Sequence, residues 1–171
     1  MSDNCELCRL AESSPFTVYE DATMKAVLAS KPAAPGHILL FPKQHYTIFE
    51  QVPDGEVDKL FIMSNKISTA VFESLNMHGT NIIVSNGLAA GQQHAHFSID
   101  IVPRTENDGL KLEWKPKQLS EEEMSTLELV MKPLTEVMAP EPKPEAPQPK
   151  IQEPLRDDSS SYLVRQLRRI P

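Results

Sequence analysis

Polar and ionisable side chains occupy every second position from His94 to Asp100. Residues 95–102 alternate strictly between apolar and polar types, which predicts a strand whose successive side chains point to opposite faces. His94, His96, Ser98 and Asp100 then share one face, and the apolar residues between them face the core. A histidine beside a serine is an arrangement that nucleophilic catalysis uses, because the base removes the hydroxyl proton. Positions two apart on a strand are separated by about 6.5 Å along the chain, so a direct bond from either histidine to Ser98 is awkward.

A second motif, C-x2-C, is formed by Cys5 and Cys8. Both thiols of such a motif can reach one tetrahedral metal ion, but a metal site needs two further ligands. Two other interpretations remain open at this point, a pair of ordinary cysteines and a redox pair.

Short apolar segments separated by turn residues predict the strands that position these side chains, at residues 16–19, 24–29, 37–41, 80–84 and 95–102. Residues 85–93 are rich in Gly, Ala and Asn and predict a polar loop. A long helix is expected over residues 54–75, with Asp54 as its cap and an apolar stripe facing the core. We expect His37 to be a histidine at the edge of the core that is bonded to the backbone.

The segment that carries the polar row resembles the signature of the histidine-triad (HIT) family of nucleotide hydrolases and transferases, including the HIT-like proteins of archaea and bacteria. Ala90-Gly91-Gln92 and Pro103-Arg104 stand at the two ends of that signature, and the three triad positions are His96, Ser98 and Asp100. The resemblance implies an α+β fold, with an antiparallel sheet of about five strands, a long helix packed on it and a C-terminal helix. It also implies a homodimer formed by extension of the sheet.

The resemblance further implies a structural zinc ion. In zinc-bearing members of the family, the paired cysteines join a histidine near the third strand and the first triad histidine. The matching residues are Cys5, Cys8, His45 and His96.

The family's chemistry begins when the middle triad histidine attacks the α-phosphate of a nucleotide. Serine stands at that position here, and Ala29 and Ser85 replace an aspartate that holds the ribose and an asparagine that contacts phosphate. The leading hypothesis is therefore a protein that binds a nucleotide or related phosphorylated ligand without nucleotidyl-histidine chemistry. The alternatives are an active nucleotide hydrolase or transferase that uses Ser98 as its catalytic residue, and a scaffold that acts through its C-terminal tail. The residues expected to contact nucleotide or phosphate are Ser85, Asn86, Gly91, Gln92 and Ser98.

The C-terminal part of the sequence changes in composition. A HIT-like domain is expected over residues 1–115, a helical extension over 116–138, a proline-rich linker over 139–154 and a basic tail over 155–171. Residues 110–114 predict a strand-like segment in which Trp114 covers apolar surface. Ser120 and Glu123 predict a capping box for the second helix, which should kink or restart at Pro133. The tail is expected either to be disordered or to form a short helix that docks on a partner protein or on its own domain.

The overall composition narrows the class of protein. The chain has 171 residues and a net charge of −7, which argues against broad binding to nucleic-acid phosphates. No apolar run approaches the roughly 20 residues of a membrane span, and the first residues do not form a signal-peptide pattern. Cysteines in such a protein should stay reduced, so we expect a cytoplasmic location.

Overall fold

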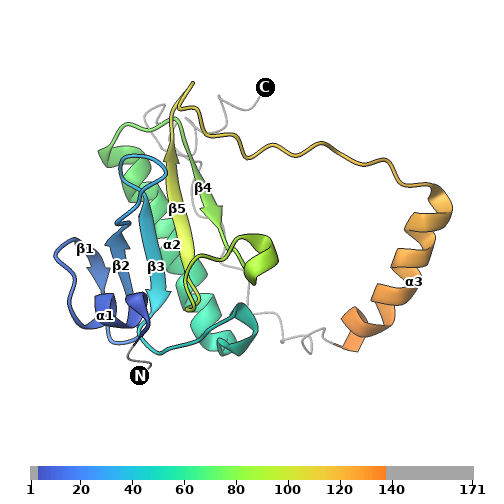
Figure 1. Cartoon of the computed structure of the whole chain (residues 1–171), viewed down its shortest axis with the longest axis horizontal. Helices are drawn as coiled ribbons and strands as arrows, with labels where there is room; N and C mark the ends of the chain where they lie inside the picture. The colour runs from blue at the N-terminus through green and yellow to red at the C-terminus, as the bar shows by residue number, and fades with distance from the viewer. Residues whose placement is uncertain (1–3, 138–171) are drawn as a thin grey trace, which may run out of the picture. The chain divides into compact units, whose positions relative to one another are not determined.

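The computed structural model describes residues 4–137, which belong to two compact units (Figure 1). The described part of the first unit comprises residues 4–110, and that of the second comprises residues 111–137. None of the described helices is long and apolar enough to cross a membrane.

The first unit is built around a five-stranded antiparallel sheet, as the sequence predicts. Its strands are β1 (Thr17–Glu20), β2 (Met24–Leu28), β3 (Ile38–Pro42), β4 (Gly79–Ile83) and β5 (Ile99–Arg104). They lie in the order β1-β2-β3-β5-β4, so the last strand in the chain is placed between β3 and β4. Two short 3-10 helices, Phe49–Gln51 and Leu88–Ala90, lie in the connections before and after the long helix and β4.

The long helix α2 (Asp54–Ser74) covers one face of the sheet and contacts β3, β4 and β5. Leu60, Ile67 and Val71 are buried in the core that the helix shares with alternate residues of these strands, as the apolar stripe predicts. The expected cap is wrong, because Pro53 is the N-cap and no side chain caps the helix. Asp54 is instead the first helical residue, where its carboxylate favours the helix dipole.

A short helix that the sequence analysis did not anticipate, α1 (Glu6–Glu12), contacts β2. Its Leu7 is fully buried with Val27, Leu39 and Phe41, which alternate along β2 and β3 with the residues of the α2 core. The sheet is therefore packed on both faces, with α2 on one and α1 on part of the other.

Strand β5 begins at Ile99 rather than at residue 95. Pro42 ends the neighbouring strand β3 and has no N–H to continue the ladder. The backbone N–H of Phe97 instead donates to the Tyr46 carbonyl at 2.6 Å. The predicted alternation is nevertheless present, because Phe97, Ile99 and Ile101 are buried in the α2 core.

In the second unit, residues 111–120 have no regular secondary structure and precede α3 (Glu121–Val137). The predicted strand-like segment over residues 110–114 is wrong, because these residues form neither a strand nor a helix. Trp114 is exposed and does not cover apolar surface. The capping box is confirmed, because Ser120 and Glu123 exchange backbone and side-chain hydrogen bonds. The helix continues through Pro133 rather than restarting there. The proline-rich linker and basic tail lie outside the described residues, and the proposed domain boundaries remain predictions.

Candidate functional site

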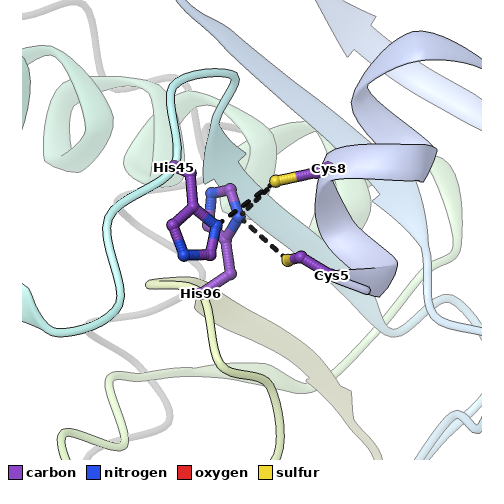
Figure 2. A group of neighbouring side chains, drawn as sticks. All are labelled: Cys5, Cys8, His45 and His96. Carbon is purple, nitrogen blue, oxygen red and sulfur yellow. Dashed lines mark hydrogen bonds between the residues drawn. The ribbon is translucent and has the colours of Figure 1, made fainter. Parts of the chain in front are cut away.

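Four side chains from three separate segments converge beside α1 (Figure 2). Cys5 is the N-cap of α1 and Cys8 lies in its first turn, so the helix directs both thiols to the same side. His45 comes from the loop after β3, and His96 from the segment that leads into β5. The ligand atoms of these four residues all lie within 4.8 Å of one another.

The distances between thiols and imidazoles fit a tetrahedral metal ion. Cys5 Sγ lies 3.5 Å from His96 Nδ1, and Cys8 Sγ lies 3.3 Å from His45 Nδ1 and 3.6 Å from His96 Nδ1. A zinc ion with ordinary bond lengths to sulfur and nitrogen would separate each such pair by about 3.6 Å. A donor set of two thiolates and two imidazoles is one that zinc prefers. These four residues can therefore hold a metal ion.

His96 is oriented for a role as a metal ligand. Its Nε2–H donates to the Pro42 carbonyl at 2.9 Å, which leaves the Nδ1 lone pair facing the two thiols. The side chain is fully buried, and this burial lowers the pKa of His96 to about 4, so the imidazole stays neutral at physiological pH. A hydrogen bond of this kind to the second nitrogen is the usual way in which proteins orient a ligating histidine.

A cavity of about 610 Å³ lies on the sheet face opposite to α2. Its walls include Leu39 of β3, Ile83 of β4 and Asp100 of β5, and Asp100 is paired in the sheet with each of the other two. The other lining residues come from the turn before β3, from α1, from the loop before β5 and, for Val102, from β5 itself. They are Glu6, Ala29, Ser30, Lys31, Ala33, His37, Ser85, Gly91, Gln92, Gln93, His94, Ser98 and Val102.

The three triad positions therefore separate into two environments. His96 belongs to the metal cluster, where both of its nitrogens are engaged, and it does not line the cavity. Ser98 and Asp100 line the cavity. No other described residue forms a hydrogen bond with the Ser98 hydroxyl. A base for Ser98 would have to come from a residue other than His96.

Two further histidines of the cavity have carboxylate partners that sequence reasoning missed. His37 Nε2 lies 3.0 Å from Asp100 Oδ1, and His94 Nδ1 lies 3.4 Å from Glu6 Oε2. The backbone N–H of Ala33 donates to His37 Nδ1 at 3.1 Å, so the expected bond between His37 and the backbone is confirmed. The two pairs join residues 63 and 88 positions apart, and no local sequence pattern signals such contacts.

The loop before β5 is held by the polar side chains that the sequence assigned to ligand contact. Gln92 accepts from the Gly87 N–H at 2.8 Å, and its amide donates to the carbonyls of Thr47 and His94. Asn86 accepts from the Phe49 N–H and donates to Glu50, and it is not among the cavity residues. Both side chains therefore shape the loop.

Gly91 of the same loop places backbone beside the cavity. Gly91 lines it in the left-handed conformation, with a φ of 84° that favours glycine. Ser85, Gly91, Gln92 and Ser98 thus lie at the cavity, whereas Asn86 supports it from outside.

Comparison with known proteins gives a consistent family relationship. The family model described as HIT domain matches residues 11–107. An uncharacterized HIT-like protein of Methanocaldococcus jannaschii is 38% identical over 107 residues, which cover 61% of this chain and 82% of that protein. An adenylylsulfatase of Arabidopsis thaliana is 34% identical over 112 residues, which cover 64% of this chain but only 57% of that protein.

A solved structure adds a metal-bound relative. The crystal structure of a zinc-bound histidine triad family protein from Mycobacterium smegmatis superposes with a TM-score of 0.60 at 27% identity. The match covers 78% of this chain and 97% of that protein.

Proposed function

Because the chain belongs to the HIT domain family, we propose that it binds a nucleotide or related phosphorylated ligand in the cavity beside Ser98, without nucleotidyl-histidine chemistry. The observation that carries this proposal is the position of Ser98. It occupies the nucleophile position of the family signature and faces the cavity, while the only triad histidine is fully buried among the metal-binding residues.

The same proposal gives the four-residue cluster a structural zinc ion, held by Cys5, Cys8, His45 and His96. Zinc in such a site would supply a stable tetrahedral link between the segments that carry its ligands. Support comes from the donor set, from the thiol-to-imidazole distances and from the second hydrogen bond of His96. The cavity does not include these ligands, which favours a structural role over a catalytic one.

The cavity offers a phosphate group hydrogen-bond donors rather than strong positive charge. The Ser98 hydroxyl has no hydrogen-bond partner among residues 4–137, whereas the Gly91 N–H beside the same space donates to the Leu88 carbonyl. A serine hydroxyl is a common phosphate ligand, because it donates a hydrogen bond to a phosphate oxygen. Ala29 lines the cavity without a side-chain hydrogen-bonding group, so a ribose would be held less firmly than in relatives with an aspartate there.

The alternative enzyme, with Ser98 activated by a neighbour, would depend on His94. This histidine lines the cavity and is oriented by Glu6, but no hydrogen bond joins it to Ser98 among residues 4–137.

The proposal also includes a homodimer, which the family resemblance implies, and a cytoplasmic location, which is expected from the sequence. A role of the tail as a scaffold concerns residues outside the described part of the chain.

Turnover and binding test the proposal together. Purified protein of measured zinc content is incubated with adenosine phosphoramidate, ADP and a diadenosine polyphosphate, and binding of the same compounds is followed by calorimetry. We expect binding without turnover, in wild type and in Ser98→Ala alike. Turnover by wild type that disappears in Ser98→Ala would refute the proposal and make Ser98 a nucleophile. The Ser98→His variant shows whether restoring imidazole restores chemistry.

A further inference from the structure

Asp100 is held in a defined orientation by a histidine whose proton has only one available position. The Ala33 N–H donates to His37 Nδ1, so that nitrogen must present its lone pair. The proton of the neutral imidazole then lies on Nε2, which donates to Asp100 Oδ1 at 3.0 Å. His37 itself is buried, and it therefore fixes the carboxylate as a hydrogen-bond acceptor.

The fixed carboxylate lies on the cavity floor, which the sheet forms. Asp100 is paired with Leu39 on one side and Ile83 on the other, and all three line the cavity. Its side chain is 28% exposed, so the carboxylate is only partly covered by the bond from His37. Ser98, on the same face, precedes it by two residues, a separation of about 6.5 Å along an extended chain.

The cavity lining does not carry enough positive charge to offset the repulsion between the Asp100 carboxylate and a bound anion. Among the described residues that line the cavity, Lys31 is the single lysine or arginine, whereas both Glu6 and Asp100 carry carboxylates. His37 cannot offer a second proton toward the cavity, because its Nδ1 is occupied by the backbone. A phosphate beside Ser98 therefore meets a fixed negative charge a short distance away.

We infer that Asp100 determines the charge class of the ligand, favouring phosphodiesters over phosphate monoesters. At pH 7.5 a monoester phosphate carries close to two negative charges, because its second pKa is about 6, whereas a diester carries one. Like charges a few ångströms apart repel strongly where water screens them only in part. The inference rests on the proposed function, since it assumes that the phosphate lies beside Ser98.

Adenosine 5′-monophosphate and its phosphate methyl ester are the probes that test this inference. They share base, ribose and phosphorus and differ by about one unit of charge. Calorimetry at pH 7.5 with the zinc-loaded full chain is expected to give a dissociation constant about tenfold lower for the methyl ester. In Asp100→Asn the amide oxygen can still accept from His37, and the preference is expected to fall below about threefold.

A matched control removes the other carboxylate at the cavity. Glu6→Gln makes the same change in net charge, but at the pair with His94 rather than on the floor. It is expected to keep most of the preference for the methyl ester. A second variant, Asp100→Ser, repeats the loss of charge with a smaller side chain, and thermal melts confirm that each variant is folded.

Each outcome has a definite meaning. Equal affinity of wild type for both probes would overturn the inference while leaving nucleotide binding intact. An equal loss of preference in Glu6→Gln and Asp100→Asn would also overturn it, since the general charge of the cavity would then be responsible. Failure of both probes to bind would refute the proposed function, and the inference with it. A preference that Asp100→Asn and Asp100→Ser abolish and Glu6→Gln keeps is the result we expect.

Discussion

The two histidines of the metal cluster should contribute differently to stability once metal is removed. His96 is fully buried and donates to the Pro42 carbonyl, whereas His45 is half-buried and its Nε2 makes one long contact of 3.4 Å with the Thr47 hydroxyl. Each histidine is replaced by alanine in turn, and the stabilities of both variants and of wild type are compared in zinc and in chelator.

The magnitude in chelator follows from what each substitution leaves behind. His96→Ala leaves the buried Pro42 carbonyl without its partner, which costs about 1–3 kcal/mol, and also opens a void where the imidazole was. A total of about 3 kcal/mol corresponds to a fall in melting temperature of roughly 10 °C in a protein of this size. His45→Ala removes a partly solvated ring and should cost less than about 1 kcal/mol.

Chemical denaturation and thermal melts in chelator measure this difference, and zinc content is determined in parallel. With zinc present, both variants should lose metal and the extra stability that it gives wild type. Equal stability of the two variants in chelator would contradict this prediction, because the buried hydrogen bond of His96 would then contribute nothing beyond metal binding.

Three other predictions concern the metal and the periphery of the sheet. Chelation should destabilise wild type by about 4 kcal/mol relative to protein in zinc at a thousandfold excess over the dissociation constant, and a melt after zinc is restored should recover the loss. The guanidinium of Arg104 holds the pKa of Asp108 well below its usual range, so the stabilisation from this pair is complete above about pH 4 and is lost as the pH falls further. The stability difference between wild type and Asp108→Asn in urea titrations should therefore shrink toward pH 2, and a difference that grows would contradict this assignment. Gly36→Ala should destabilise the protein by about 2 kcal/mol in thermal melts, because Gly36 has a φ of 83° and the added Cβ would lie 2.5 Å from the Leu75 side chain. The control Gly55→Ala, at an open helical position, should be neutral or slightly stabilising in the same melts.

Much of the fold was predictable because its elements are strongly periodic. The α2 stripe repeats over more than five helical turns, and the strands are short apolar segments bounded by turn residues. The ends of the elements were less predictable, because they depend on neighbours. Strand β5 begins late since Pro42 on the adjacent strand cannot donate, and α1 is too short for a periodic signal.

The site shows the same division between local pattern and tertiary contact. The family resemblance, and not the spacing of the residues, predicted that Cys5, Cys8, His45 and His96 lie close together, as the structure shows. The pair of His37 and Asp100 could not be predicted, because it depends on the register between β3 and β5. Gln92 was expected to face a ligand, and only the structure shows that its side-chain amide is bonded to the backbone of Gly87, Thr47 and His94.

The position of His96 also has a consequence for the order in which the protein is assembled. Synthesis from the N-terminus at 5–20 residues per second leaves roughly 4–18 seconds between the appearance of Cys8 and that of His96. During this interval the chain contains both cysteines but not yet His96. The four-ligand metal site can therefore form only when His96 has been synthesised and β5 pairs with β3 and β4. Zinc would then bind after the sheet has formed and stabilise it. A ribosome-bound chain that ends before His96 should therefore bind the ion weakly.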